Sequence, residues 1–357
     1  MRNSIQLANH VISENSAAYI IAEMSGNHNM DFDRAVRILH AAKESGADAI
    51  KLQTYTADTI TLDCDDPCFQ ITQGTLWDGT TLHKLYEKAY TPWEWQPKLQ
   101  KIAEDIGLDF FSSPFDPTSV DFLEKLDVPA YKVASFEITD IPLIRKIAEL
   151  GKPVMISTGI ATLADIELAV QTCRDMGNEN VILLKCCSAY PTPYEDINLK
   201  TMVNLASTFD CIVGLSDHTL GDTVAVASVA LGAKVVEKHM TLSRADGGVD
   251  SAFSMEPAEF KQMVEHIRIV EKAMGKVTYE LSEKQKGERE HARSLFIASD
   301  MKAGDILDGS NMRSVRPSNG LHTKYYDMLL GKKVKQDVKM GTPLNWGIID
   351  FSDEGTS

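Results

Sequence analysis

The sequence predicts a closed (β/α)8 barrel of eight strands, followed by a small, mostly β module. Short apolar runs alternate with longer amphipathic stretches, which is the pattern of repeated strand–helix units that build a parallel sheet. Eight such units fit within residues 1–280, close to the usual size of this barrel, about 250 residues. From residue 291 onward the pattern changes to short β-like pieces separated by glycine turns, such as SLFIASDMKAGDIL.

Eight apolar runs are the predicted strands. They cover residues 19–25, 49–55, 108–115, 130–135, 153–159, 181–189, 212–218 and 235–241. Amphipathic helices are predicted between them, for example over 32–45, 93–106, 163–176 and 223–231, and a last helix over 257–274 closes the ring of a TIM barrel. A doubly wound open sheet is the alternative fold. It requires a glycine-rich phosphate loop after the first strand, which residues 23–27 (EMSGN) do not supply.

The predicted domains are the barrel (1–280), a linker (281–290) within the charged segment 276–293, the β module (291–350) and a tail (351–357). A long insertion, 56–91, follows the second strand, and loops of this length in compact domains are frequently lids or binding loops. Trp77 and Trp93 either pack this insertion onto the barrel or stack on a substrate. Asp78 is predicted to cap a turn rather than to contact a ligand.

Composition limits the partners and the location. The formal net charge of −15 over 357 residues argues against nucleic-acid binding, which requires a basic patch. No run approaches the roughly 20 apolar residues that span a bilayer, and the N-terminus lacks the apolar core of a secretory signal. We therefore expect a cytoplasmic protein without membrane contacts. The six cysteines form no CxxC pair and are predicted to be reduced, structural thiols.

Polar side chains end all eight predicted strands, where barrels of this class carry their active sites. The strand-end residues are Glu23 with Ser25, Lys51 with Gln53, Ser113, Lys132 with Ser135, Ser157 with Gly159, Ser188 with Tyr190, Ser216 with His218, and Glu237 with His239. His218 and His239 end neighbouring strands, which lie about 4.8 Å apart. Their imidazoles are therefore predicted to share one divalent ion, with carboxylate, water and substrate oxygens completing the shell.

Two lysines, Lys51 and Lys132, lie on otherwise apolar strands, and such amines are rarely buried without a partner or a task. Together with the strand-end serines they favour an anion site, because phosphate and carboxylate groups accept strong charge-assisted hydrogen bonds from ammonium and hydroxyl groups. A Schiff-base aldolase with a desolvated lysine as nucleophile is an alternative enzyme class.

The strand ends resemble the sialic acid synthase family in order and spacing over almost the whole chain: AEMSGNHN (22–29), KLQ (51–53), SSPFD (112–116), YKVAS (131–135), ISTG (156–159), SAYPTP (188–193), GLSDHT (214–219) and EKHMT (237–241). The C-terminal module, with RPSNG at 316–320, resembles the antifreeze-like (SAF) domain of this family. Within the family, residues 74–95 are most similar to pseudaminic acid synthases. Ser113 and Ser188 stand where sialic acid synthases usually have Thr and Asn, which suggests a different sugar.

The resemblance implies a condensation of phosphoenolpyruvate with an N-acetylated aldose that releases phosphate by C–O cleavage. For a pseudaminic acid synthase the aldose is 2,4-diacetamido-2,4,6-trideoxy-β-L-altropyranose, and the product serves flagellin glycosylation or a cell-surface polysaccharide. N-acetylneuraminate and legionaminate synthases, which use the same chemistry on other sugars, are the alternatives. A carbohydrate- or ice-binding adapter beside an inert barrel is the non-enzymatic alternative that the C-terminal module suggests.

The resemblance also implies roles for individual residues. Glu23 is the acid/base or charge-stabilising carboxylate, and His218 and His239 bind the divalent ion, which is Mn²⁺, Mg²⁺ or Co²⁺. Phosphoenolpyruvate is held by Lys51, Ser113, Lys132, Ser135, Ser157, Ser188, Tyr190 and Ser216. The sugar is contacted by Gln53, Glu137, Tyr190, Asp250 and Arg316, the last from the partner subunit of a domain-swapped homodimer.

Overall fold

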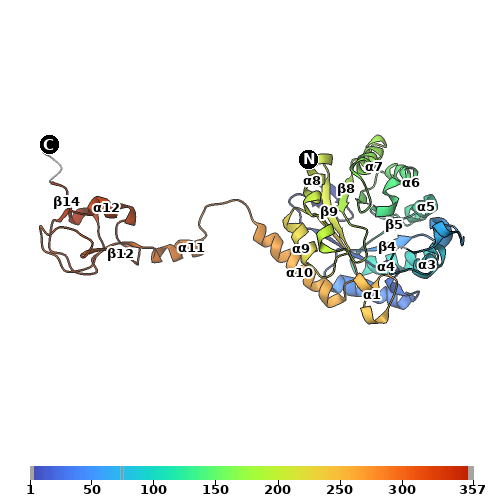
Figure 1. Ribbon diagram of the computed structural model, residues 1–357, viewed down its shortest axis with the longest axis horizontal. Coiled ribbons are helices and arrows are strands. Elements are labelled where there is room, and N and C mark those ends of the chain that lie inside the picture. The colour runs from blue at the N-terminus through green and yellow to red at the C-terminus, as the bar shows by residue number, and fades with distance from the viewer. Residues whose placement is uncertain (1–3, 73, 75, 353–357) are drawn as a thin grey trace. The chain divides into compact units, whose positions relative to one another are not determined.

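The computed structural model describes residues 4–72, 74 and 76–352, and the chain divides after Gly275 into two compact units. The first unit contains a closed barrel of eight parallel strands, so the predicted fold is confirmed (Figure 1). The strands follow one another around the barrel in chain order, and the last pairs with the first. They are β3 (Tyr19–Glu23), β4 (Ala49–Thr54), β5 (Asp109–Pro114), β6 (Tyr131–Val133), β7 (Val154–Ser157), β8 (Val181–Lys185), β9 (Ile212–Asp217) and β10 (Val235–His239).

Helices lie around the outside of this barrel (Figure 1). They are α1 (Phe32–Glu44), α4 (Gln96–Asp105), α5 (Pro117–Lys125), α6 (Ile141–Ala148), α7 (Leu163–Asp175), α8 (Lys200–Phe209), α9 (Thr223–Ala230) and α10 (Pro257–Met274). Helix α1 shows why the sequence folds this way. Asp31 caps its first turn by accepting a hydrogen bond from a backbone N–H, and Ala35, Ile38 and Ala42 recur at helical spacing and are buried.

All eight barrel strands end one to four residues earlier than the sequence predicts, and β3 and β8 show why. Ser25 has a φ of +46°, which cannot continue an extended strand, and it begins a short 3-10 turn, η1 (Ser25–His28). After β8, the carbonyl oxygens of Cys187 and Ala189 accept hydrogen bonds from the Thr192 hydroxyl, at 3.0 and 2.8 Å, instead of continuing the ladder. The polar residues beyond these strands therefore lie on turns, not on strands.

A two-stranded hairpin, β1 (Ser4–Leu7) and β2 (His10–Ser13), precedes the barrel, and the sequence pattern does not predict it. Ile5, Leu7 and Ile12 are buried in the same core as the barrel strands. The hairpin is thus an integral part of the first unit.

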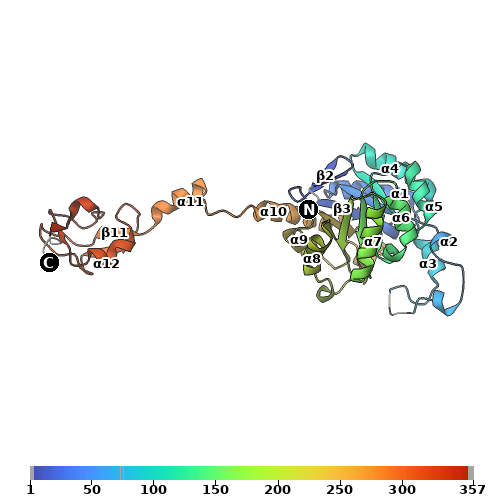
Figure 2. The same ribbon diagram turned by 90° about the horizontal axis from the view of Figure 1, so that it is seen from above.

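The insertion after β4 carries α2 (Ala57–Ile60) and α3 (Leu82–Ala89) and stands out from the barrel (Figure 2). Trp93 follows the insertion and has a packing role. Its ring lies 4.8 Å from the ring of Phe122, and its Nε1 donates a hydrogen bond to the Tyr55 carbonyl oxygen.

The second unit has its own apolar core, which includes Leu295, Leu307 and Leu344. Its elements are α11 (Glu283–Glu288) and α12 (Tyr326–Leu329), and two antiparallel pairs, β11 (Ser294–Ile297) with β12 (Met312–Val315) and β13 (Lys333–Val334) with β14 (Ile349–Asp350). In the part of the chain that the structure describes, no helix has both the length and the apolar character needed to cross a membrane.

Candidate active site

A cavity of about 660 Å³ opens at the C-terminal ends of the barrel strands. It is lined by every predicted site residue except Arg316, namely Glu23, Lys51, Gln53, Ser113, Lys132, Ser135, Glu137, Ser157, Ser188, Tyr190, Ser216, His218, His239 and Asp250. Arg316 is exposed and follows β12 in the second unit. Its contact with a sugar in a partner subunit stays a prediction.

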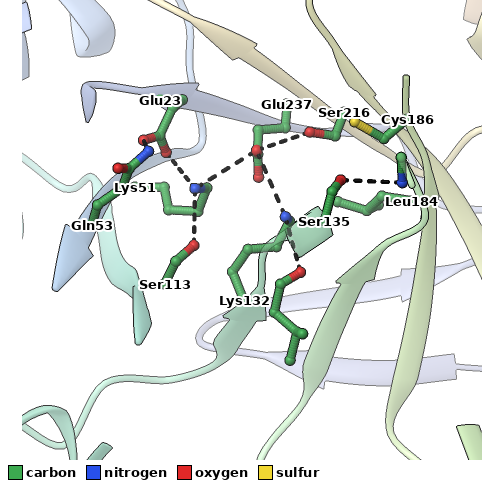
Figure 3. A network of polar contacts seen from close by, with 12 residues as sticks. Glu23, Lys51, Gln53, Ser113, Lys132, Ser135, Leu184, Cys186, Ser216 and Glu237 are labelled. Atoms are coloured by element: carbon green, nitrogen blue, oxygen red, sulfur yellow. Dashed lines mark hydrogen bonds and ion pairs between the residues drawn. The ribbon is translucent and has the colours of Figure 1, made fainter. Parts of the chain in front are cut away.

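Lys51 is the centre of a polar network on the cavity floor (Figure 3). Its Nζ lies 2.5 Å from Glu23 Oε2, 3.2 Å from the Ser113 hydroxyl, to which it donates, and 3.7 Å from Glu237 Oε1. The amide of Gln53 donates to the other carboxylate oxygen of Glu23 at 3.1 Å. The sheet register places these groups together, because Lys51 pairs with Glu23 on β3 and Gln53 pairs with Ser113 on β5.

Glu237 is the residue of this network to which the sequence assigns no role. Its Oε1 lies 3.7 Å from Lys51 Nζ and 4.0 Å from Lys132 Nζ, and it accepts a hydrogen bond from the Ser216 hydroxyl at 3.1 Å (Figure 3). The sequence does contain a signal for it, since Glu237 lies two residues before His239 and therefore on the same face of β10. Glu237 links the two lysines.

Burial and mutual attraction shift the pKa values of this cluster of two carboxylates and two amines. Burial raises the pKa of Glu23 despite the nearby Lys51. Burial opposes the charged form of Lys51, but attraction by Glu23 and Glu237 outweighs it and raises the Lys51 pKa. Burial alone raises the pKa of Glu237, but attraction by Lys132 and Lys51 outweighs it and lowers that pKa. The pKa of Lys132 is lowered, because burial outweighs the attraction of Glu237.

Hydroxyl groups lie beside these charges. Ser135, separated by one residue from the end of β6, begins a 3-10 turn, η4 (Ser135–Thr139), and its Oγ accepts a hydrogen bond from the Gly159 backbone N–H at 3.1 Å. The Ser157 Oγ is buried and has no hydrogen-bond partner among the described residues. A Cβ on Gly159 would lie 2.6 Å from the Ser135 Oγ and closer still to the Ser188 Oγ, so only glycine leaves the space between these hydroxyls open. Such a group of hydroxyls suits an oxyanion.

The rings of His218 and His239 lie 5.3 Å apart, centroid to centroid. The Nδ1 of His218 is 3.1 Å from the Cys187 carbonyl oxygen, so this nitrogen carries the proton and the other retains its lone pair. The Nδ1 of His239 is buried with no hydrogen-bond partner within the described chain. Burial, together with the charges of His218 and Lys51, lowers the pKa of His239 well below its usual value, which keeps the ring neutral.

Despite burial, attraction by Cys186 raises the pKa of His218. With His218 in its neutral form, the two imidazoles fit a divalent cation that draws its remaining ligands from elsewhere. Over residues 4–72, 74 and 76–352, no group of three or more His, Cys, Asp or Glu side chains is arranged to hold a metal ion. Water and substrate oxygens would have to complete the coordination shell. All six cysteines are free thiols.

Two further carboxyl groups, Asp250 and Glu137, line the cavity. Asp250 accepts a hydrogen bond from the Ser25 hydroxyl, and burial raises the Asp250 pKa. Burial also raises the pKa of Glu137, to about 7, and its Oε2 is buried without a hydrogen-bond partner among the described residues. Both groups therefore favour the neutral carboxyl more than an exposed acid does.

Trp77 brings the insertion into the site. Its ring lies 5.7 Å from the ring of Tyr190, and its Nε1 donates to the Val249 carbonyl oxygen at 3.0 Å. The adjacent Asp78 accepts a hydrogen bond from the Gly74 backbone N–H at 2.9 Å and closes a turn, as predicted. Trp77 thus lines the cavity, whereas Asp78 shapes the loop.

The insertion and the η4 turn form an apolar wall of the cavity, which consists of Ile60, Ile71, Leu82, Leu85, Tyr86 and Phe136. Tyr86 packs edge-on against Tyr55, with ring centroids 5.5 Å apart. The cavity therefore combines a charged floor with an apolar side, which suits a ligand that carries both anionic groups and methyl groups.

Residues 38–279 match the NeuB family, and residues 292–348 match the SAF domain. The chain is 45% identical to a pseudaminic acid synthase of Campylobacter jejuni over 92% of this chain and 96% of the relative. It is also 45% identical to a pseudaminic acid synthase of Helicobacter pylori, over 93% and 98% of the two chains. An N,N'-diacetyllegionaminic acid synthase of Campylobacter jejuni is 37% identical, over 90% and 96%.

Among solved structures, the N-acetylneuraminic acid synthetase of Leptospira borgpetersenii is similar, with a TM-score of 0.71 and 30% identity over 80% of this chain and 95% of that one. The expected resemblance to sialic acid synthases is confirmed by these matches. The chain therefore belongs to the NeuB family and carries a SAF domain after its barrel.

Proposed function

We propose that this protein condenses phosphoenolpyruvate with 2,4-diacetamido-2,4,6-trideoxy-β-L-altropyranose and releases phosphate, which is the reaction of a pseudaminic acid synthase. The observation that carries this proposal is the convergence of Lys51 and Lys132 on one cavity floor, which His218 and His239 also line. Two buried amines suit the phosphate and carboxylate of phosphoenolpyruvate, and two neighbouring imidazoles suit a divalent cation. The 45% identity to pseudaminic acid synthases supports the choice of sugar.

The anion side of the site uses both amines and the surrounding hydroxyls. Lys51 and Lys132 neutralise phosphoenolpyruvate, and hydrogen bonds come from Ser113, Ser135, Ser157, Ser188, Tyr190 and Ser216. An anion that enters this floor competes with Glu23 and Glu237 for the same amines, which lie 2.5 to 4.0 Å from those carboxylates. Substrate binding therefore rearranges the charge cluster, and its proton content changes with it.

The metal side of the site consists of His218 and His239, which would hold Mn²⁺, Mg²⁺ or Co²⁺. A cation bound there supplies Lewis acidity toward the aldehyde oxygen of the open-chain sugar. The side chains support this role because the rings lie 5.3 Å apart and one nitrogen of His239 has no hydrogen-bond partner in the described chain.

We assign to Glu23 the handling of charge and protons at C2 of phosphoenolpyruvate. C3 forms the new bond to the aldehyde carbon, the aldehyde oxygen takes a proton from Glu23, and positive charge develops at C2, which the now ionised Glu23 stabilises. Water then adds to C2 and returns one proton to Glu23. The bond from C2 to the bridging oxygen breaks as the C2 hydroxyl becomes a carbonyl group, and phosphate leaves with the bridging oxygen and the hydroxyl proton. Lys51, 2.5 Å from Glu23, holds the carboxylate in place.

The apolar wall supports a 6-deoxy sugar with acetamido groups over a sugar with a C6 hydroxyl. A methyl group is stabilised against Ile60, Leu82 and Leu85, whereas a hydroxyl there loses hydrogen bonds to water without replacement. We assign the polar contacts of the sugar to Gln53, Glu137, Tyr190 and Asp250. A legionaminate precursor is also a 6-deoxy sugar, so the wall does not separate it from the altrose derivative, but the lower identity of 37% disfavours it.

The partner subunit completes the proposed site. We propose a domain-swapped homodimer in which Arg316 reaches the sugar bound by the other subunit, as the family resemblance implies. The delivery of the product to flagellin or a surface polysaccharide rests on the same resemblance, and the cytoplasmic location remains the expectation from the sequence.

One assay tests this function directly. Purified protein is mixed with phosphoenolpyruvate, Mn²⁺ and, in separate reactions, the pseudaminate, legionaminate or N-acetylneuraminate precursor, and phosphate release is followed. The highest kcat/KM is expected with the altrose derivative, and oxygen-18 in the bridging position is expected in the released phosphate. Retention of the label in the sugar acid would exclude C–O cleavage. Trapping of a lysine adduct with borohydride would instead support the Schiff-base aldolase.

A further inference from the structure

A buried ion pair joins the outward faces of β9 and β10. Lys238 Nζ lies 2.6 Å from Asp217 Oδ2, and the two side chains are 1% and 0% exposed. These residues are direct partners in the parallel register of the two strands. Each immediately precedes a histidine that lines the cavity, His239 and His218 respectively. The pair therefore lies directly behind the two imidazoles.

The same pair fixes the turn that contains His218. Asp217 Oδ1 accepts a hydrogen bond from the Thr219 backbone N–H at 2.9 Å, and Oδ2 accepts one from the Thr219 hydroxyl at 3.1 Å. Lys238 Nζ also donates to the Thr219 carbonyl oxygen at 2.5 Å. One amine from β10 thus holds the residues on both sides of His218.

The backbone pairing of β9 and β10 stops at the residues that form this ion pair. The register between β9 and β10 ends at Lys238 and Asp217, so it does not include His218 and His239. On the far side of β10, His239 is still in register with Glu23 of β3. On one side, His239 is therefore linked to the His218 turn through the side-chain contacts of Lys238. On the other side, backbone pairing with β3 holds His239 in place.

Stability alone is a weak reason for this arrangement. Moving two charges out of water costs several kcal/mol per ion, and well-packed apolar residues are frequently as stable as a buried ion pair. Groups that hydrogen-bond to metal-binding histidines orient them and raise metal affinity. Lys238 and Asp217 instead hold the backbone that carries the two histidines. We infer that Lys238 and Asp217 are positioning residues that set the separation of His218 and His239 and thereby the affinity for the divalent cation. This inference rests on the proposed metal role of the histidines.

The test compares Mn²⁺ binding in the full-length enzyme and in the double variant Asp217→Asn/Lys238→Met. The double variant removes both charges and the link between the strands, while the amide oxygen introduced at position 217 can still accept the hydrogen bond from Thr219. Titration calorimetry is expected to give a Kd for Mn²⁺ at least about tenfold higher than in the wild type, as for other groups behind metal ligands. The Co²⁺ absorption spectrum is expected to shift as well, whereas the melting temperature stays within a few degrees.

Tyr19→Phe is the matched control. Its hydroxyl donates to Asp109 Oδ2 at 2.6 Å and links β3 to β5 at the N-terminal ends of the strands. This variant loses a largely buried hydrogen bond between strands, as the double variant does. The lost bond lies at the N-terminal ends of the barrel strands, whereas the two histidines lie at the C-terminal ends. Its Kd for Mn²⁺ is expected to equal that of the wild type, even if its melting temperature falls.

Each outcome decides the inference. An unchanged Kd in the double variant overturns the positioning role while leaving the proposed function intact. A wild type that binds none of Mn²⁺, Mg²⁺ and Co²⁺ overturns both the inference and the proposed metal role of the two histidines. If the double variant does not fold, Lys238→Arg keeps the charge and tests the same geometry, because the larger, planar guanidinium places its N–H donors differently from one compact amine. A Kd for Mn²⁺ that rises supports the inference, and a wild-type Kd overturns it.

Discussion

Lys51 Nζ lies 2.5 Å from Glu23 Oε2 on the cavity floor, and both side chains are almost completely buried, at 4% and 1% exposure. Together with Lys132 and Glu237 they form a cluster in which two potential positive charges face two potential negative ones (Figure 3). The floor is therefore close to neutral before an anion binds. A substrate with a phosphate and a carboxylate upsets this balance.

We predict that the protein takes up protons when it binds phosphoenolpyruvate. An anion beside the amines stabilises the protonated forms of both Glu23 and Lys132, so both pKa values move upward on binding. The raised pKa of Glu23 and the lowered pKa of Lys132 in the free protein leave room for this uptake. Calorimetric titrations in buffers with different ionisation enthalpies measure it, and the affinity is expected to fall as the pH rises. Glu23→Gln is expected to reduce the uptake. Proton release on binding would contradict the prediction.

Glu237→Gln is predicted to lower the free energy of unfolding. Phosphoenolpyruvate is predicted to raise the free energy of unfolding of this variant by more than it does for the wild type. Removing one partner of a buried ion pair costs about 3–5 kcal/mol, because Lys132 loses the carboxylate 4.0 Å from its Nζ while Lys51 keeps Glu23. The amide still accepts the hydrogen bond from Ser216. Denaturant unfolding, with and without phosphoenolpyruvate, measures both effects. Glu283→Gln, which breaks an exposed pair with Lys286, is the control and is expected to change the free energy of unfolding by less than about 0.5 kcal/mol.

The strands and the residues that line the cavity could be predicted because they depend on local patterns. Apolar runs mark the barrel strands, and alternation along each strand states which side chains share a face, as for Lys51 and Gln53. The role of Glu237 could not be predicted in this way. Its function depends on lysines that arrive from β4 and β6, and no spacing along the chain encodes those contacts.

The points where strands end were harder to predict than the strands themselves. Ser25 is part of an apolar-to-polar transition that suggests a longer strand, yet its positive φ and its hydrogen bond to Asp250 take it out of the sheet. Asp250 lies more than 200 residues later in the chain. Tertiary contacts of this kind override local pattern. The same reason separates Trp77, which lines the cavity, from Trp93, which packs on the barrel.

Gly159→Ala is predicted to weaken phosphoenolpyruvate binding without unfolding the barrel. The new Cβ would lie 2.6 Å from the Ser135 Oγ and closer still to the Ser188 Oγ, so both hydroxyls must move. A hydrogen bond to a charged group contributes about 1.5–3 kcal/mol, so the KM for phosphoenolpyruvate is expected to rise about tenfold or more. Steady-state kinetics at saturating sugar measure this rise. Gly287→Ala in α11, where a Cβ meets no atom within 4 Å, is the control and should leave the KM unchanged.

Removal of divalent metal is predicted to abolish turnover and to leave the fold intact. Chelation followed by desalting should eliminate phosphate release, and added Mn²⁺ or Co²⁺ should restore it, since the chain offers only the two imidazoles for this ion within its described residues. His239→Ala is expected to prevent the restoration, with a circular dichroism spectrum like that of the wild type. Full activity after chelation would contradict the metal role and would favour the lysine aldolase.

The pH dependence of sugar binding is predicted to follow Glu137. Burial raises its pKa to about 7, so the carboxyl is largely protonated below that pH and ionises above it. The protonated carboxyl donates a hydrogen bond to an acceptor oxygen of the sugar, and that donor is lost as the pH rises through about 7, so the KM for the sugar is expected to increase. Rates measured with saturating phosphoenolpyruvate on both sides of this pH test it. Glu137→Gln keeps a hydrogen-bond donor at every pH, so the KM of this variant for the sugar should not increase as the pH rises. A variant that retains the wild-type pH profile would assign the ionisation to another group, of which Asp250, with its raised pKa and its place in the same cavity, is the next to examine.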